Sequence, residues 1–381
     1  MREETSALTT QHSGIGRILV VKLADLGDLL TATPALRALR LRFPGAHISA
    51  LVTPHTAPLL WGNDAVDRVL IFPKAAFDGW EGFRSPVKTI QAVARAASLA
   101  RQLRAQAFDA VFLLHHLTTP GGRAKYQSLL AATGARRRFG LDNGPATFLT
   151  DSVSDEGFGA RHEVDYWLEV VGLAGAGMAE PRLEVFLTDE ERAGADDWWR
   201  SRTLEASSVV ALHPGSGTFS LARRWPAERY AVVGAALAGA GHRVLVIAGP
   251  GEEALAEEVR AGIGGTAAIV APQTTPRHLG ALLRRCDLFV GNDSGVMHLA
   301  ATVGVPTVGV FGLTNHRAWG PYPPDEHRVA RLELPCSPCL YPGHGLGARE
   351  GCPPRMCLET LEPSVVVEAA RDLLKQRVPS R

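Results

Sequence analysis

The sequence predicts an α/β protein built from two doubly wound, Rossmann-like domains, each with a parallel sheet. Short β-branched runs alternate with longer helical patterns twice along the chain, which is typical of two parallel sheets with crossover helices. A chain of 381 residues also exceeds one ordinary core, and its 46% hydrophobic content is enough to fill two. We expect the first domain over residues 17–190 and the second over 207–362.

The first domain contains four apolar runs of strand length, separated by stretches with helical periodicity. The expected strands are Arg17–Val21, His47–Val52, Arg68–Phe72 and Ala110–Leu114. The expected helices are Leu29–Arg42, Pro86–Gln106 and Arg123–Thr133. Between the domains, a strand-like run over Leu183–Leu187 leads through a charged helix into the second sheet.

The second domain repeats the alternation. Its expected strands are Val209–Leu212, Arg243–Ala248, Ala268–Val270, Leu288–Val290 and Thr307–Phe311. Its expected helices are Ala227–Ala238, Glu252–Ile263, Pro276–Arg285 and Val296–Val303. Ligands of open α/β sheets bind outside the carboxyl ends of the strands, so we expect a site in a cleft between two facing domains.

Charge and apolar patterning exclude several classes of protein. The 40 basic and 39 acidic residues nearly cancel, so no global charge attracts nucleic acid or an anionic membrane. Residues 1–16 begin with a polar, acidic stretch, unlike a secretory signal, and we expect them to form a disordered tail. No apolar run reaches the roughly 18 residues that a membrane span needs. We therefore expect a cytoplasmic protein whose membrane contact, if any, is peripheral.

The segment Leu288–Phe311 is the most informative part of the chain. It reads as a buried strand, a polar turn with glycine, a helix, a Gly-Val-Pro turn and a second strand. The turn holds Asn292, Asp293, Ser294 and Gly295, which are residue types found at helix N-termini, where free N–H groups bind anions. The alternative interpretation is that Asp293 and Ser294 only cap the helix.

A glycine-rich loop follows the first strand of the second domain, in the sequence HPGSGTFSLARRWP from residue 213. The backbone of Ser216 and Gly217, together with the cations Arg223 and Arg224, suits a diphosphate. A basic pair that only aids solubility is the alternative. After the next strand, Glu252 is a candidate to bind a ribose hydroxyl of the donor. The alternative is an acid in the first turn of a helix, where its charge interacts favourably with the helix dipole.

The first strand of the chain ends in a second candidate site, KLADLGDLLTATP from residue 22. Gly27 and Asp28 lie at the turn into a helix, so a carboxylate stands at the carboxyl end of the strand. The pattern lacks the three glycines of a dinucleotide fingerprint, which argues against a dehydrogenase. Asp28 could simply cap the helix, and Asp25, three residues earlier, is the competing carboxylate.

In their order along the chain, from residues 22, 213 and 288, these three motifs resemble those of glycosyltransferase family 9, the heptosyltransferases of the lipopolysaccharide inner core. The resemblance runs from about Arg17 to about Gln376. It implies a GT-B fold, an acceptor domain followed by a nucleotide-sugar domain, and a last helix over 363–377 that crosses back to the first domain. It also implies Asp28 as general base. The implied donor ligands are Ser216, Gly217, Arg223, Glu252, Asp293, Ser294, Gly295 and His298.

The chain departs from the usual family pattern at the cation before Trp225, which is commonly Lys and here is Arg223. Arg offers a bidentate fork where Lys offers a point charge, so we expect the neutralising role to survive with altered geometry. No Asp-x-Asp pair, the common carboxylate clamp for Mg²⁺ or Mn²⁺, occurs in the sequence. We therefore expect catalysis without a metal or other cofactor.

Four of the five cysteines gather in an insertion over residues 335–358. They are Cys336, Cys339, Cys352 and Cys357, a spacing that suits a metal, and the segment between them has no core-forming periodicity. Structural zinc, free thiols and an iron–sulfur cluster remain as alternatives, with His344 as a substitute ligand. A closed site of four ligands has no open position for substrate, so we expect no catalysis there.

The resemblance implies an inverting, metal-independent transferase that moves heptose from ADP-heptose to a sugar hydroxyl of a glycolipid or oligosaccharide acceptor. Glycosyl transfer with inversion needs one carboxylate to accept the proton of the attacking hydroxyl, which is the role expected for Asp28. Two alternatives remain open. One is a GT-B enzyme with another nucleotide-sugar donor or another acceptor, and the other is an ADP-binding regulator with a cysteine metal or redox site. The sequence leaves the oligomeric state open.

Overall fold

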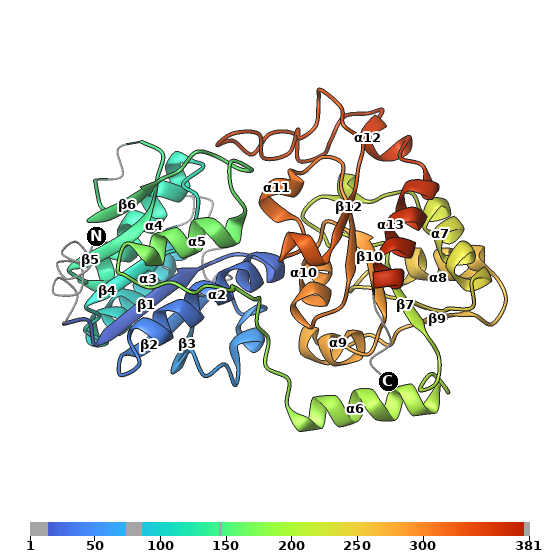
Figure 1. Cartoon of the computed structure of the whole chain (residues 1–381). Coiled ribbons are helices and arrows are strands. Elements are labelled where there is room, and N and C mark those ends of the chain that lie inside the picture. The colour runs from blue at the N-terminus through green and yellow to red at the C-terminus, as the bar shows by residue number, and fades with distance from the viewer. Residues whose placement is uncertain (1–13, 74–85, 145–146, 377–381) are drawn as a thin grey trace. The chain divides into compact units, whose positions relative to one another are not determined.

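The computed structural model describes residues 14–73, 86–144 and 147–376 (Figure 1). Two compact units divide the chain. Unit 1 takes the described residues up to Gly157 and residues 163–180, and unit 2 takes residues 158–162 and those from Pro181 onward. Each unit has one six-stranded sheet in which every strand pair is parallel. The expected α/β class with two parallel sheets is confirmed.

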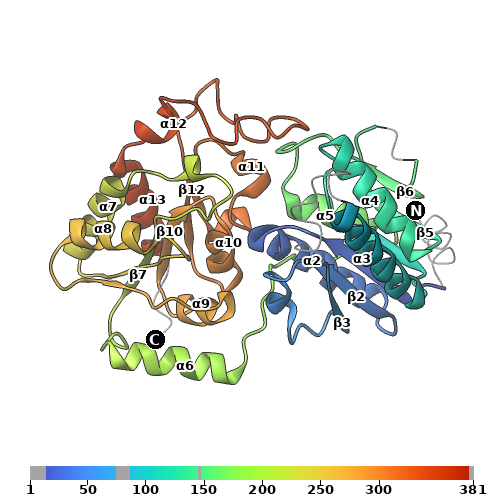
Figure 2. The same cartoon turned by 180° about the vertical axis from the view of Figure 1, so that it is seen from behind.

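The sheet of unit 1 has the strand order β3-β2-β1-β4-β5-β6, which is the doubly wound order. Its strands are β1 (Arg17–Lys22), β2 (His47–Val52), β3 (Arg68–Ile71), β4 (Ala110–Leu113), β5 (Arg137–Asp142) and β6 (Asp151–Ser154). Its α-helices are α2 (Leu26–Arg42), α3 (Pro86–Ala105), α4 (Pro120–Thr133) and α5 (Glu163–Gly172), with a short 3₁₀ helix η1 (Ala57–Leu60). Figure 2 shows α3 and α4 on the side opposite α5.

Unit 2 repeats this topology, with the order β12-β11-β10-β7-β8-β9. Its strands are β7 (Val209–His213), β8 (Arg243–Val246), β9 (Ala268–Val270), β10 (Leu288–Asn292), β11 (Thr307–Val310) and β12 (Arg328–Ala330). Its α-helices are α6 (Asp189–Ser201), α7 (Ala227–Gly239), α8 (Glu253–Ile263), α9 (Pro276–Leu283), α10 (Gly295–Thr302), α11 (His316–Trp319), α12 (Met356–Glu359) and α13 (Pro363–Gln376). Two 3₁₀ helices are η4 (Leu221–Arg223) and η5 (Pro324–Glu326).

The central strands were predictable because helices cover both faces of a parallel sheet, so these strands are apolar along their whole length. All four residues of β4 and all five of β7 and β10 are buried. Strands β5, β6 and β12 were not expected. Strands β5 and β6 are polar, with the sequences RRFGLD and DSVS, and β12 has only three residues at the sheet edge.

The segment between the two sheets differs from its expected form. Leu183–Leu187 is not a strand, because it pairs with no neighbour, although Leu183 is buried and Leu187 lies beside Gly280 of α9. The segment and α6 both fold with unit 2, so the boundary lies at Pro181 and not after residue 190. Of the tail expected over residues 1–16, residues 1–13 lie outside the described part of the chain.

The last helix, α13, folds with unit 2, and its expected crossing to the first domain stays a prediction. The helix packs against α7 and against the strands β10, β11 and β12 of unit 2. Its Val366, Ala370 and Leu373 belong to the hydrophobic core of that unit. The apolar stripe that marks α13 in the sequence therefore covers one face of the second sheet.

Candidate active site

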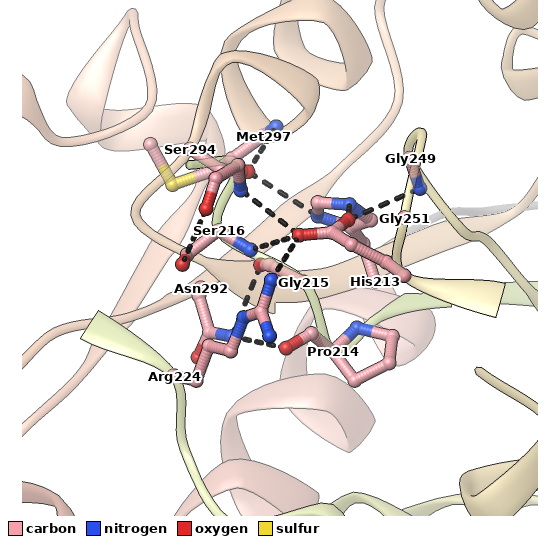
Figure 3. A network of polar contacts seen from close by, with 12 residues as sticks. His213, Pro214, Gly215, Ser216, Arg224, Gly249, Gly251, Asn292, Ser294 and Met297 are labelled. Carbon is pink, nitrogen blue, oxygen red and sulfur yellow. Dashed lines mark hydrogen bonds and ion pairs between the residues drawn. The ribbon is translucent and has the colours of Figure 1, made fainter. Parts of the chain in front are cut away.

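The two motifs of unit 2 meet at one edge of its sheet because their strands are neighbours. Strands β7 and β10 pair in parallel, with His213 opposite Gly291, so the loops that follow them leave the sheet side by side. Asn292 joins the two loops, since its Nδ2 donates to the carbonyls of Pro214, at 2.7 Å, and Gly215, at 3.1 Å. Its Oδ1 accepts from Trp225 N at 3.0 Å. Figure 3 shows Asn292 beside Pro214 and Gly215.

Glu252, the residue before α8, turns its carboxylate into the glycine-rich loop. Its Oε1 accepts from the backbone N–H groups of Ser216 and Gly217, each at 3.0 Å. Its Oε2 accepts from Gly249 N at 3.1 Å, and Arg224 Nη2 donates to Oε1 at 2.8 Å. Both carboxylate oxygens are thus used inside the protein, and the expected contact with a ribose hydroxyl stays a prediction.

Burial alone would raise the pKa of Glu252, which is 4% exposed. The hydrogen bond and charge of His213, followed by the N–H groups of Gly217 and Ser216, outweigh that effect and hold the pKa well below its usual range. His213 itself is buried, with Nε2 3.3 Å from Glu252 Oε2 and Nδ1 3.3 Å from Ser294 Oγ. The carboxylate is therefore charged over the whole working range of pH.

Gly215 and Gly217 each have a structural reason to be glycine. A Cβ at Gly215 would overlap the Glu252 carboxylate, so no larger residue fits there. Gly217 has φ +69°, in the left-handed region that favours glycine. The Gly-Ser-Gly sequence therefore wraps the loop closely around a buried anion.

Arg223 and Arg224 point to different partners. Arg224 pairs with Glu252, whereas Arg223 Nη1 lies 3.4 Å from Asp293 Oδ2 and Nη2 donates to Ser216 O at 3.0 Å. The structure therefore brings Arg223 and Asp293, both singled out in the sequence, into one site. Arg224 was not among the predicted ligands, because a basic pair in a sequence gives no sign of which member faces inward.

The start of α10 carries the other predicted donor ligands. Ser294 caps the helix, and its side chain accepts from Met297 N at 3.4 Å. The N–H groups of Gly295 and Val296 meet no acceptor among the residues that the structure describes. Free N–H groups beside the Arg223 guanidinium form an environment for an anion. His298, on the first turn of α10, is buried, and its role stays a prediction.

In unit 1, Asp28 lies in the first turn of α2 and is half-buried. Lys22, at the end of β1, is 3% exposed, and its Nζ lies 4.0 Å from the centre of the Trp167 ring. Burial lowers the pKa of Lys22, and the charges of Asp28 and Glu163 oppose that shift. Asp25 is instead the N-cap residue of α2 and pairs with His55 at 3.2 Å.

A buried histidine ties together three segments of unit 1. His116 follows β4, and its Nδ1 and Nε2 contact Asp155 at 2.9 Å and Glu163 at 3.0 Å. Burial by itself would lower the pKa of His116, but the charge of Glu163 and the hydrogen bonds to Asp155 and Glu163 raise the pKa to about 9. This ion cluster was not predicted from the sequence, because its members are separated by up to 47 residues.

The four clustered cysteines are free thiols, of which Cys357 is buried and Cys336 and Cys352 are exposed. Burial raises the pKa of the Cys357 thiol, and the charges of the other three thiols raise it further. No group of three His, Cys, Asp or Glu side chains in the described residues is arranged as metal ligands. Structural zinc stays a prediction.

A family model for glycosyltransferase family 9 (heptosyltransferase) matches residues 96–346, more than half of the chain. The chain belongs to glycosyltransferase family 9. It is accordingly a glycosyltransferase, and the expected GT-B fold is confirmed by solved structures of the family. One of these, E. coli ADP-heptose lps heptosyltransferase II, is 20% identical with a TM-score of 0.69, over 94% of this chain and 99% of that one.

Two curated relatives extend the comparison of this family 9 enzyme. Lipooligosaccharide heptosyltransferase 2 of Campylobacter jejuni is 33% identical over 44% of this chain and 51% of that protein, so the match spans about half of that relative. Lipopolysaccharide heptosyltransferase 3 of Escherichia coli K12 is 27% identical over 78% of this chain and 82% of that protein. In the described part of this chain, no helix is both long and apolar enough to cross a bilayer.

Replacing Glu252 by glutamine is expected to destabilise unit 2. The glutamine amide is neutral, so Arg224 loses its ion pair, and the amide NH₂ would face the backbone N–H groups that the carboxylate accepts from. Breaking a buried ion pair typically costs about 3 kcal/mol. Urea unfolding of Glu252→Gln measures the loss. The matched control is Glu253→Gln, because Glu253 is the exposed neighbour in the same turn. Equal midpoints for both variants would contradict the bracing role of Glu252.

His116 is expected to make unit 1 less stable at high pH. Its pKa rises from about 6.5 in the unfolded chain to about 9 when folded. The stabilisation is therefore complete below about pH 6.5 and is lost as the pH rises through 9, a change of about 3 kcal/mol.

The free energy of unfolding of wild type and His116→Asn, measured at about pH 6 and about pH 10, tests this. The advantage of the wild type should shrink at the higher pH. His47→Asn is the control, since that side chain is 46% exposed. An advantage that does not change with pH would show that the histidine is not charged in the folded protein.

Proposed function

We propose that this family 9 enzyme transfers heptose from ADP-heptose to a sugar hydroxyl of the lipopolysaccharide inner core, or of a related glycan, with inversion. The observation that carries the proposal is the anion site of unit 2. There the guanidinium of Arg223 and the open N–H groups of Gly295 and Val296 stand at one sheet edge. The donor and the acceptor class follow the relatives, which are heptosyltransferases of lipopolysaccharide or lipooligosaccharide.

Unit 2 would hold the diphosphate of the donor through this anion site. Arg223 offers a planar, permanently charged fork, and the N-terminus of α10 offers free N–H groups with a favourable dipole. Asp293 holds Arg223 at 3.4 Å, which is long for a hydrogen bond, so the guanidinium keeps donors for a ligand. These groups would balance the charge of the departing ADP. In other transferases a metal ion held by carboxylates has this role.

The reaction would take its base from unit 1. The acceptor hydroxyl attacks the anomeric carbon, its proton passes to the Asp28 carboxylate, and the bond from that carbon to the phosphate oxygen breaks with its electron pair on ADP. Asp28 is suited to this role because it is partly exposed in the first turn of α2. Asp25 is the competing carboxylate, and the match of Gly27 and Asp28 to the Gly-Asp pair of the family favours Asp28.

A glycolipid acceptor would bring the enzyme to the membrane that carries it. We therefore propose a cytoplasmic enzyme with peripheral contact at the inner face of the plasma membrane. This proposal rests on the acceptor class alone.

Asp28→Asn is expected to lower turnover by about two to four orders of magnitude while ADP still binds. The asparagine keeps the size of the side chain but cannot accept the proton. The assay follows release of nucleoside diphosphate from ADP-heptose, with UDP-sugars and GDP-sugars as competing donors, EDTA present and a heptose-free core lipid as acceptor. Asp25→Asn is the matched control and should retain turnover.

Each arm of this assay can contradict one part of the proposal. Full activity of Asp28→Asn would exclude Asp28 as the base. Turnover from a UDP-sugar or GDP-sugar in place of ADP-heptose would change the donor. Loss of wild-type activity in EDTA would show that the transfer needs a metal ion.

We also propose that Cys336, Cys339, Cys352 and Cys357 hold a structural zinc ion. The proposal rests on the spacing of these four cysteines in the sequence, because four thiolates are a common donor set of closed structural zinc sites. Zinc there would fix the shape of residues 336–357 and would take no part in the transfer.

Elemental analysis of the purified enzyme tests the metal site and should find stoichiometric zinc. Cys352→Ser should release it, whereas Cys286→Ser, at the buried cysteine outside the cluster, should not. Iron would change the identity of the ion, and the absence of any metal would leave free thiols.

A further inference from the structure

The cysteine-rich insertion lies against the glycine-rich loop. We call residues 336–357 the strap. Arg349, in the middle of the strap, donates from Nε to the carbonyl of Phe219, and its own carbonyl accepts from Ser220 Oγ at 2.7 Å. The guanidinium also stands 4.8 Å from the centre of the Phe219 ring. One strap residue therefore binds two consecutive loop residues through backbone, hydroxyl and ring.

The strap contacts loop residues that precede Arg223 in the sequence and loop residues that follow it. Before Arg223, the ring of Tyr341 stacks on Phe219 with centroids 6.0 Å apart and planes at 5°. After it, Arg355 Nη1 donates to the carbonyl of Arg224 at 3.4 Å. A Cβ at Gly351 would lie 3.1 Å from that of Ala222, so the strap backbone passes close to the loop.

A short chain of hydrogen bonds connects Arg349 to the anion site. Ser220, which donates to the carbonyl of Arg349, accepts at its own carbonyl from Ser216 Oγ at 3.0 Å. The carbonyl of Ser216 in turn accepts from Arg223 Nη2 at 3.0 Å. A movement of Phe219 and Ser220 would therefore shift the carbonyl that orients the Arg223 guanidinium.

The strap is itself anchored to the body of unit 2, so it can act as a fixed support. The N–H groups of Cys339 and Leu340 both donate to the carbonyl of Leu313, at 2.9 and 3.0 Å. Leu340 is fully buried, and the Tyr341 ring lies 5.1 Å from that of Trp319. The loop thus rests on a segment with its own hydrophobic anchor.

We infer that Arg349 is a positioning residue for the nucleoside diphosphate of the donor, acting through Phe219 and Ser220 on Arg223. A loop with two glycines loses conformational entropy when it orders around phosphates, and this loss weakens binding. Contacts that order the loop before the ligand binds reduce the entropic cost. Arg349 does not belong to the predicted ligand set, and its contacts with the loop are at Phe219 and Ser220. The inference rests on the proposed donor site and adds the element that holds it in shape.

The test is ADP binding by isothermal titration calorimetry to the full-length wild type and to Arg349→Ala, with unfolding midpoints measured in parallel. The variant should bind ADP about tenfold more weakly with an unchanged midpoint, and the KM for the donor should rise while kcat at saturating donor is retained. Arg349→Lys keeps the cation over Phe219 and should recover part of the affinity. Glu350→Ala is the control, because Glu350 is 82% exposed and contacts Arg349 only from the solvent side, at 3.6 Å.

A double-mutant cycle isolates the contact. Phe219→Leu removes the ring but keeps the carbonyl, so if Arg349 acts through Phe219, the losses in the two single variants and the double variant will not add. An unchanged ADP affinity in Arg349→Ala would overturn the inference and leave the proposed function standing. Failure of the wild type to bind ADP at all would overturn both. An equal loss in Glu350→Ala would assign the effect to surface charge and would also overturn the inference.

Discussion

The buried carboxylate of Glu252 is the interaction on which the geometry of unit 2 depends. A buried charge is costly unless every lone pair is used, and here three backbone N–H groups and a guanidinium use them. The donors come from the loop after β7 and the turn after β8, so one anion fixes two segments that are distant in sequence. Gly215 leaves room for that anion, because a Cβ there would overlap the carboxylate, and the loop turns at Gly217 with a positive φ.

The same carboxylate separates the roles of two adjacent arginines. Because Arg224 is engaged with Glu252, Arg223 is left to face Asp293 and the start of α10. The site therefore presents one cation held loosely beside open N–H groups. Arg349 contacts the same loop at Phe219 and Ser220, so the loop is bound both by Glu252 and by the strap.

Unit 1 uses paired buried charges in a comparable way. Lys22 ends β1 and His116 follows the adjacent strand β4, and each has carboxylates around it. Clusters of this kind are common at functional sites, because burial and specific partners together set the protonation of each group. Asp28 is part of this cluster, because its charge acts to raise the pKa of Lys22. Both units thus place their buried charges at the carboxyl ends of their central strands.

Periodicity by itself determined the central strands and most helices, since burial on both faces leaves an apolar run that no other element explains. Strands β5, β6 and β12 were not predicted, because the polar sequences of β5 and β6 resemble loops and β12 has only three residues at the sheet edge. Leu183–Leu187 shows the opposite failure: it has a strand pattern but no neighbour with which to pair. For α13 the pattern predicted a helix, and only the packing identified the face of the second sheet that it covers.

For the candidate site, the sequence by itself determined the family, the glycine-rich loop and the helix start at Ser294, because each is a local pattern of backbone chemistry. Only the tertiary structure decided that Arg223 faces Asp293, that Glu252 is enclosed by the loop, and that Asn292 joins two motifs. It also placed His116 between Asp155 and Glu163. These contacts join residues separated by about 30 to 80 positions, and such pairing depends on the strand order of the sheets, which no local pattern in the sequence encodes.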